Sequence, residues 1–247
     1  MDLIELKQIG TDFKRHPWEL VRSKILMYFV DKLFNEKVSL VDIGSGDAFI
    51  AKSLARKFPE NTIIAIDNNY SNYIVHNITE SGLRNISFLE DISSAGRKFN
   101  GAILMDVLEH IEKPEVVLVD LKNHLESNSF VFVTVPAWQF LFSRHDEELG
   151  HFKRYTCKDL KQMVEKSGYA VRNTGYFFQS LFIVRSVQRL FNRGYKQSTL
   201  YNWKGGRFIT DLLKNLFWVE FKFSWYLSQV GIRIPGLTCY CICQPLP

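Results

Sequence analysis

Short apolar runs alternate along the chain with segments whose apolar residues recur at helical spacing. Five runs are rich in β-branched or aromatic residues, as buried strands are, and they span residues 38–43, 62–67, 86–91, 101–106 and 129–136. Residues 168–177 and 236–245 are candidates for a sixth and a seventh strand. Because strands that alternate with helices form parallel sheets covered on both faces, the pattern predicts a doubly wound α/β fold with a seven-stranded, mostly parallel sheet.

Residues 178–235 separate the last two predicted strands. They hold two helix-like stretches, 177–196 and 208–231, which are dense in Phe, Trp, Tyr and positive charge. This composition differs from that of a linker, so we expect a helical insertion or cap before the last strand. A chain of 247 residues can bury one full core, and residues 1–247 are therefore predicted to form a single domain.

Charge is distributed unevenly along the chain. The net charge is +5, and residues 176–247 hold nine Lys and Arg against two Asp and Glu. The basic residues are interleaved with aromatic ones, a composition that suits the surface of an anionic membrane. The aromatic residues concerned are Phe182, Phe191, Trp203, Phe217, Trp218, Phe221 and Trp225. Packing against the sheet, or a homodimer face, would suit the same residues, and the sequence leaves these interpretations open.

The cysteines do not resemble a disulfide framework. Cys239, Cys241 and Cys243 alternate along one predicted strand and Cys157 is distant from them, so we expect small core residues in a reducing compartment. The first twenty residues lack the apolar core of a signal peptide, and no run reaches the roughly 18 apolar residues of a membrane span. We therefore expect a cytoplasmic protein, with the inner face of the membrane as the place where the basic segment would act.

A glycine turn follows the first predicted strand, in the stretch "VDIGSGD". Gly44 and Gly46 allow the backbone to approach a ligand closely, and the next helix points its amide groups toward that ligand. The NAD fingerprint GxGxxG requires a third glycine where Phe49 stands. An NAD-linked oxidoreductase is therefore kept only as an alternative.

Carboxylates lie at the ends of the first three strands. Asp42 would repel a pyrophosphate but suits a ligand with an ammonium group. Asp67 is placed to bind ribose hydroxyls, and Asp91 lies within reach of an adenine amino group. Together they describe a nucleoside with an amino-acid tail.

Four stretches resemble, in order and spacing, the motifs of class I S-adenosylmethionine-dependent methyltransferases: "VDIGSGDAFIAKSLA", "AIDNN", "LED" and "MDVLEHIEKPEVVLVDLKNHL". The resemblance covers about residues 18 to 177, with Ala48 where the family usually has a third glycine. It implies a Rossmann-like methyltransferase fold and S-adenosylmethionine as the cofactor. The cofactor-binding residues that it implies are Trp18, Arg22, Asp42, Gly44, Ser45, Gly46, Asp67, Asn68, Asp91, Ile92 and Met105.

Two further stretches narrow the expected acceptor. "DVLEHI" is similar to a motif of small-molecule methyltransferases around ubiquinone biosynthesis, and "RHDEELGHFKRYTCKDLKQMVEKSGY" looks like a bacterial branch found in polysaccharide or lipid-linked glycan pathways. Both imply a small-molecule, sugar or lipid-linked acceptor. The Asn/Asp-Pro-Pro-aromatic motif of nucleic-acid amino-methyltransferases does not occur at residues 105–108, so we expect no nucleic-acid partner.

The same region holds the candidate catalytic residues Glu109, His110 and His151. Imidazole titrates near neutrality, so either histidine could accept a hydroxyl proton as the methyl group arrives. Asp106, Glu109 and His110 would share one face of a helix, and the resemblance links the Glu/His pair to a metal ion. A capping Asp, a solvated Glu and a packed His explain the spacing equally well. Residues 137–156 are the predicted lid over the acceptor.

The sequence therefore predicts a methyltransferase that O-methylates a small molecule, a sugar or a lipid-linked glycan. Besides the NAD-linked oxidoreductase, a non-catalytic scaffold that binds the cofactor stays open.

Overall fold

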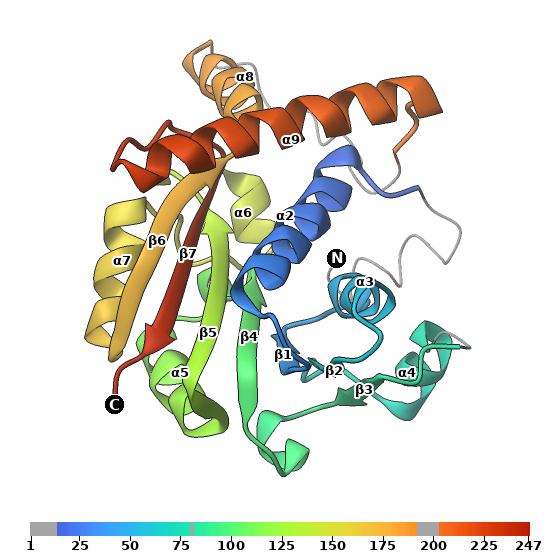
Figure 1. Cartoon of the computed structure of the whole chain (residues 1–247). Helices are drawn as coiled ribbons and strands as arrows, with labels where there is room; N and C mark the ends of the chain where they lie inside the picture. Colours follow the sequence, from blue (N-terminus) through green and yellow to red (C-terminus); the bar gives the residue numbers. More distant parts are fainter. Residues whose placement is uncertain (1–13, 80–81, 192–202) are drawn as a thin grey trace.

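One sheet organises the part of the chain that the computed structural model describes, which is residues 14–79, 82–191 and 203–247. Within it, seven strands are joined in the order β3-β2-β1-β4-β5-β7-β6 (Figure 1). The strands are β1 (Ser39–Ile43), β2 (Thr62–Ile66), β3 (Ile86–Leu89), β4 (Phe99–Met105), β5 (Leu125–Pro136), β6 (Tyr169–Phe177) and β7 (Thr238–Pro245). Each lies within or overlaps a predicted strand.

Strands β1 to β5 pair in parallel, and β7 lies antiparallel between β5 and β6. The predicted seven-stranded, mostly parallel sheet is thus confirmed. The chain leaves β1 toward β2 and β3 on one side and returns to β4 on the other. A crevice at the carboxyl ends of β1 and β4 follows from this reversal of direction, and such crevices bind ligands in open α/β sheets.

Helices connect most of the strands. They are α2 (Pro17–Leu33), α3 (Phe49–Lys57), α4 (Asn72–Ile78), α5 (Pro114–Leu121), α6 (Arg144–Glu148), α7 (Cys157–Lys166), α8 (Gln179–Leu190) and α9 (Arg207–Gln229), with short 3₁₀ turns η1 (Ile92–Ala95), η2 (Leu108–His110), η3 (Lys122–His124) and η4 (Gln139–Leu141). Their starts follow local sequence rules. Pro17 is the first residue of α2, where its fixed φ suits a helix and no N–H is needed. Thr156 and Asp159 form a capping box at the start of α7.

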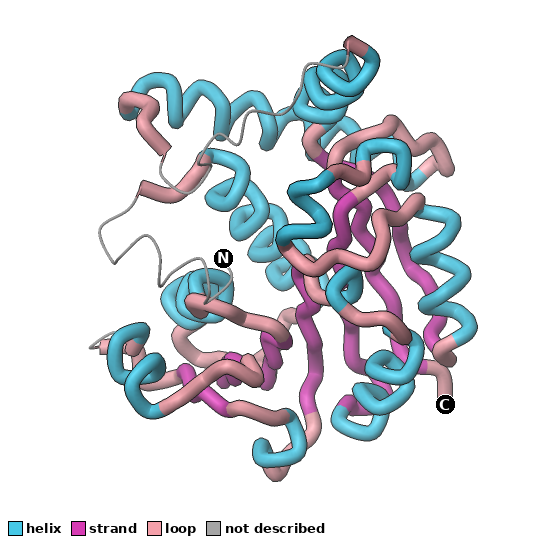
Figure 2. The backbone as a smooth tube through the Cα atoms, turned by 180° about the vertical axis from the view of Figure 1, so that it is seen from behind, coloured by secondary structure: helices cyan, strands magenta, loops and turns pink. Residues whose placement is uncertain are grey.

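Each face of the sheet carries its own apolar core. Leu40 belongs to the core beneath α2, α3 and α9, whereas its neighbour Val41 points into the core beneath α5 and α7. This alternation is the ordinary consequence of strand geometry. Figure 2 shows the α5 and α7 face, opposite to the face that α2 and α9 cover in Figure 1. Cys239, Cys241 and Cys243 are buried in the second core, as predicted from their alternation.

The predicted helical insertion corresponds to α8 and α9, between β6 and β7. Phe217 and Phe221 of α9 are buried in the first core. For these two residues the structure therefore favours packing against the sheet among the interpretations that the sequence left open. Residues 192–202 of the insertion lie outside the described residues. Within the described part of the chain, no helix combines the length and hydropathy that crossing a membrane requires.

Candidate active site

A cavity of about 740 Å³ lies at the carboxyl ends of β1, β2 and β4. Every residue that the sequence names as a cofactor-binding or catalytic candidate lines it. On the cofactor side these are Trp18, Arg22, Asp42, Gly44, Ser45, Gly46, Asp67, Asn68, Asp91, Ile92 and Met105, and on the other side Glu109, His110 and His151. Residues far apart in sequence are thus brought to one site, while their individual roles stay predictions.

The glycine turn after β1 has a backbone that requires glycine. Gly44 has φ +66° and Gly46 has φ +52°, in the left-handed region that L side chains rarely adopt. A Cβ on Gly44 would lie 2.7 Å from Cγ2 of Val107, so the tight contact there is with the segment before η2. Ala48, at the start of α3, also has a left-handed φ of 58°. Glycine adopts this conformation without strain, which accounts for the glycine that the resembling family usually has at this position.

Asp42 is buried beneath this turn. The Ala51 amide, in the first turn of α3, favours the charged form of the Asp42 carboxyl group, since the start of a helix favours negative charge. Burial nevertheless raises the pKa of Asp42 to about 7. Its Oδ2 atom is buried without a hydrogen-bond partner in the described part of the chain. A buried acceptor oxygen of this kind fits a cationic donor in the cavity.

Asp67 combines a turn-forming role with a place at the cavity. Its Oδ2 accepts the Gly46 N–H at 3.0 Å and its Oδ1 accepts the Asn69 N–H at 2.9 Å. Ser45 is held by Tyr70, whose hydroxyl lies 2.6 Å from the Ser45 hydroxyl. Asp67 therefore organises the turns that follow β1 and β2, and a ribose contact remains compatible with its other lone pairs.

Asp91 and Ile92 lie at the start of η1. Asp91 is exposed, and its Oδ1 accepts the Ser93 N–H at 2.7 Å, so it caps the 3₁₀ turn. Hydrogen bonds from the hydroxyl and the N–H of Ser93 hold the pKa of Asp91 below its usual range. Asp91 nevertheless lines the cavity.

Arg22 of α2 binds Asp106 rather than standing free over the cavity. Its Nη1 lies 2.6 Å from Oδ2 of Asp106, and its Nη2 donates to the Thr134 hydroxyl at 3.3 Å. That hydroxyl donates to Oδ1 of Asp106 at 3.0 Å. Arg22 and Thr134 therefore engage Asp106, and Asp106 is not a member of the group that brings Glu109 and His110 together, although the sequence spacing placed it with them.

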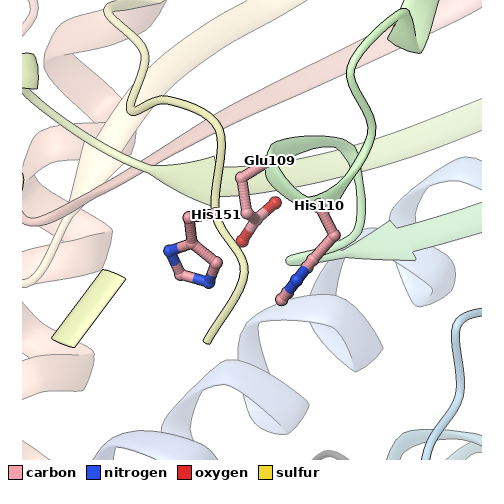
Figure 3. Close-up of side chains that lie close together, drawn as sticks. All are labelled: Glu109, His110 and His151. Atoms are coloured by element: carbon pink, nitrogen blue, oxygen red, sulfur yellow. The ribbon is translucent and has the colours of Figure 1, made fainter. Parts of the chain in front are cut away.

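His151 instead joins Glu109 and His110. One potential ligand atom from each lies within 4.8 Å of the others, and Figure 3 shows the two imidazoles flanking the Glu109 carboxyl. The rings of His110 and His151 meet edge to face, with centroids 4.6 Å apart. Glu109 is fully buried, and neither of its carboxyl oxygens has a hydrogen-bond partner in the described part of the chain. Burial is the main reason why the pKa of Glu109 lies well above its usual range, and the negative charge of Asp106 adds to the rise.

His151 is oriented by a buried carboxylate that sequence reasoning missed. Nδ1 of His151 lies 3.0 Å from Oδ1 of Asp146, and Arg154 donates to the same carboxylate at 2.8 and 3.1 Å. Burial alone would raise the pKa of Asp146, yet the hydrogen bonds from His151 and Arg154 hold it well below its usual range. Asp146 is thus ionised at neutral pH and fixes the imidazole ring.

A weak sequence signal could have found Asp146. Ser143 and Asp146 form the S-x-x-D pattern of a capping box, and the structure shows that box at the start of α6. The pairing with His151 had no signal, because it depends on how the loop after α6 turns back. The Phe152 amide donates to the Glu109 carbonyl at 2.7 Å, which ties that loop to η2.

Comparison with known proteins agrees with this geometry. Residues 15–174 match the family model described as "Methyltransferase domain". No curated protein matches the sequence.

Solved structures share the fold at low sequence identity. The [4+2]-cyclase SpnF aligns with a TM-score of 0.57 and 15% identity, covering 96% of this chain and 86% of its own. Coclaurine N-methyltransferase, bound to N-methylheliamine and SAH, aligns with a TM-score of 0.56 and 12% identity, covering 90% and 72%. A SAM-dependent methyltransferase from Archaeoglobus fulgidus aligns with a TM-score of 0.55 and 16% identity, covering 98% of both chains.

The family model covers well over half of the chain, and the sheet order, the glycine turn and the cavity agree with it. The alternative of an NAD-linked oxidoreductase is accordingly set aside. The chain belongs to the methyltransferase domain family, whose enzymes take the methyl group from S-adenosylmethionine.

Proposed function

We propose that this methyltransferase O-methylates a hydroxyl group, with His151 as the general base. The observation that carries the proposal is the pair of His151 and ionised Asp146 at the cavity, next to the buried Glu109. An imidazole whose one nitrogen is bound to a carboxylate presents the other as the proton acceptor. Oxygen nucleophiles need such a base because a hydroxyl is a weak nucleophile until its proton is removed.

The cavity residues fit S-adenosylmethionine, which supplies a methyl group already activated by its sulfonium. The unpartnered Oδ2 of Asp42 suits the ammonium of its methionine part. Gly44 and Gly46 offer backbone that a ligand can approach, and Asp67 with Asn68 suits the ribose. Trp18, Asp91, Ile92 and Met105 would surround the rest of the cofactor. Arg22 forms an ion pair with Asp106, so the pair would present little net charge to the cofactor.

The protein's part in the reaction is mainly positioning and proton removal. Closing residues 137–156 over the acceptor would align its oxygen with the methyl carbon at roughly 3 Å and exclude water. His151 would take the hydroxyl proton of the acceptor as the methyl group is transferred, and Asp146 would stabilise the imidazolium. Glu109, whose buried carboxyl oxygens have no partner in the described part of the chain, would hydrogen-bond the acceptor.

The acceptor that we propose is a small molecule, a sugar or a lipid-linked glycan, in the cytoplasm at the inner face of the membrane. The exposed apolar side chains of α8 and α9 favour the lipid-linked class. The fold alone does not determine the reaction, since the similar structure of SpnF belongs to a [4+2]-cyclase. A scaffold that binds the cofactor without turnover is therefore the second candidate.

Transfer of a labelled methyl group from S-adenosylmethionine into soluble, membrane and glycolipid extracts, followed by mass spectrometry, tests the proposal. We expect a product methylated on oxygen. His151→Ala should lower kcat by about 10² to 10⁴-fold while the affinity for S-adenosylmethionine, measured by calorimetry, stays within about twofold. Cofactor binding without label in any extract would favour the scaffold. Methylated nitrogen or carbon in the product would reject the O-methyl assignment.

The Glu109, His110 and His151 set also allows a test for a divalent cation. Calorimetric titration of wild type and of His110→Ala with Mg²⁺ and Zn²⁺, together with turnover measured in a chelator, shows whether this set binds a cation or acts through His151 as a general base. If turnover persists in the presence of a chelator, the general-base mechanism stands alone. If turnover requires a cation and His110→Ala abolishes cation binding, the cluster is a metal site, and the base assignment to His151 fails.

A further inference from the structure

Helix α9 is apolar on two opposite faces. One face, which includes Phe217 and Phe221, is buried against the core. The other presents large apolar side chains at steps of three and four residues, which we call the outer stripe. It consists of Phe208, Leu212, Leu216, Val219, Phe223 and Tyr226, all exposed. Because the steps average close to 3.6 residues, the stripe runs along the length of the helix.

Helix α8 extends this apolar surface. It contributes no buried residue, and Ile183, Val184, Val187 and Leu190 are all about half exposed or more, with Leu190 at 81%. Figure 1 shows α8 and α9 together at one end of the molecule. Apolar surface on this scale marks a site that meets another apolar phase.

Positive charge accompanies the apolar surface. Within residues 178–191 and 203–235 there are seven Lys and Arg and two Asp and Glu. Of the two acidic residues, Asp211 is paired with Lys214 at 2.9 Å, and Glu220 accepts the Ser180 N–H at 3.4 Å. The face therefore carries a net positive charge.

A cluster of lysines lies beside the stripe, where α9 meets α2. Tyr28 of α2 packs edge to face with Trp218 and Trp225 of α9, with ring centroids 5.8 and 5.5 Å apart. The ammonium groups of Lys24 and Lys222 lie 4.2 and 4.1 Å from rings of this aromatic group.

Lys32 adds a third ammonium group, 4.7 Å from the Trp225 ring. In the described part of the chain, no salt bridge joins Lys24, Lys32 or Lys222 to a carboxylate. Three like charges held around one set of rings repel one another, and an anion placed among them would relieve that repulsion. We call Lys24, Lys32 and Lys222 the lysine cluster.

The lysine cluster and the outer stripe belong to one surface. Lys222 is three residues from Val219 and four from Tyr226 of the stripe, and it is equally close to Trp218 and Trp225 of the aromatic group. Residues at these spacings are neighbours on a helix. Basic side chains along the edge of an apolar helix face match a bilayer surface, where phosphates lie above the acyl chains.

We propose that α8 and α9 dock this enzyme on an anionic phospholipid bilayer, with the outer stripe among the acyl chains and the lysine cluster on the headgroup phosphates. The charge of the surface selects this occupant over a second copy of the chain, since two such faces would bring like charges together. This refines the membrane location proposed above. Its readout is lipid binding, so it can fail while methyl transfer stands.

Vesicle co-sedimentation of the full chain tests the proposal, with phosphatidylglycerol mixed into phosphatidylethanolamine and with phosphatidylcholine alone. We expect binding to the anionic vesicles, and weaker binding as the salt rises from about 0.01 to about 1 M and the Debye length falls from about 30 to about 3 Å. Equal binding to both vesicle types, or no binding to anionic vesicles at low salt, would overturn it.

Neutralising the lysine cluster tests whether these three lysines bind the lipid, as opposed to the net charge of the whole protein. The triple variant Lys24→Gln, Lys32→Gln, Lys222→Gln should lose on the order of a hundredfold in vesicle partitioning at low salt. The matched control neutralises three exposed lysines of α7, on the other face of the sheet: Lys158→Gln, Lys161→Gln and Lys166→Gln. Equal loss in both variants would show that only net charge matters, and the lysine cluster would then not be the lipid contact.

The outer stripe is tested by Val219→Asp with Phe223→Asp, against Val116→Asp with Val119→Asp on α5, whose side chains are also exposed. All four positions are exposed, so both variants should fold, which circular dichroism checks. We expect only the α9 variant to lose vesicle binding. If analytical ultracentrifugation shows a wild-type dimer that the α9 variant dissociates, the stripe is an interface between copies of the chain and the bilayer proposal is wrong.

Discussion

At the scale of single residues, the site depends on what burial does to carboxyl groups. Asp42 and Glu109 are buried with at least one oxygen unpartnered, and burial raises the pKa of both. Asp146 is just as buried, yet His151 and Arg154 hold its pKa low. Residues of one chemical type therefore differ in charge according to their hydrogen-bond partners.

Asp42 should make the stability of the cofactor-free protein depend on pH. The unfolded chain ionises this residue near pH 4, whereas the folded protein keeps the proton until about pH 7. The free energy of unfolding should therefore fall as the pH rises from about 4 to about 7, and the loss should level off above 7.

Asp42→Asn removes this pH-dependent loss of stability, because the amide side chain does not ionise, and it keeps nearly the same shape. Urea denaturation should find the variant more stable than wild type by on the order of 2–4 kcal/mol at pH 8, with little difference at pH 4. Calorimetry should find its affinity for S-adenosylmethionine weakened at least tenfold. A variant that is less stable than wild type at pH 8 would contradict the raised pKa of Asp42.

Asp146→Asn tests the positioning of His151. The variant should lower kcat by about 10² or more, because the imidazolium loses the carboxylate that stabilises it, while cofactor affinity stays close to wild type. Glu147→Gln, at an exposed position beside it on α6, is the matched control and should leave kcat unchanged. If cofactor affinity falls in step with kcat, Asp146 supports the fold of the cavity rather than the base.

At the scale of elements, the turn after β1 and the segment before η2 fit against each other. The left-handed backbone of Gly44 and its contact with Val107 join the cofactor side of the cavity to the segment that carries Glu109 and His110. A side chain at position 44 would therefore disturb the segment that holds the proposed catalytic residues Glu109 and His110, even before a ligand binds.

Gly44→Ala should lower the melting temperature and kcat together, since it combines an unfavourable φ with a 2.7 Å contact to Val107. Adding Val107→Ala to this variant removes the contact but not the strained φ. We expect the double variant to recover part of kcat and only part of the melting temperature. No recovery at all would mean that the strained backbone, and not the contact with Val107, dominates.

At the scale of the whole molecule, α9 serves both the core and the surface. Phe221 packs against Phe29 of α2 and is fully buried, with ring centroids 5.6 Å apart. Phe223, two positions later, is exposed. The insertion is therefore expected to unfold together with the sheet as a single domain.

Phe221→Ala should lower the free energy of unfolding by about 3–5 kcal/mol, whereas Phe223→Ala should change it by no more than about 0.5 kcal/mol. Urea denaturation, followed by both tryptophan fluorescence and circular dichroism, measures both. The two signals should report one transition. Two separate transitions in the wild type would show that α8 and α9 form an independently stable unit.

The sequence by itself determined the strands, the order of strands and helices, the glycine turn and the carboxylates near it. These features depend on local rules, because strand periodicity, the φ of glycine and residue chemistry act within a few positions. Tertiary structure alone decided the pairing of Arg22 with Asp106, the approach of Asp146 and Arg154 to His151, and the burial of Phe217 and Phe221. Each depends on which segments fold back on one another. A helix that is apolar on both faces, as α9 is, shows in its sequence that it will contact two environments but not which face meets the core.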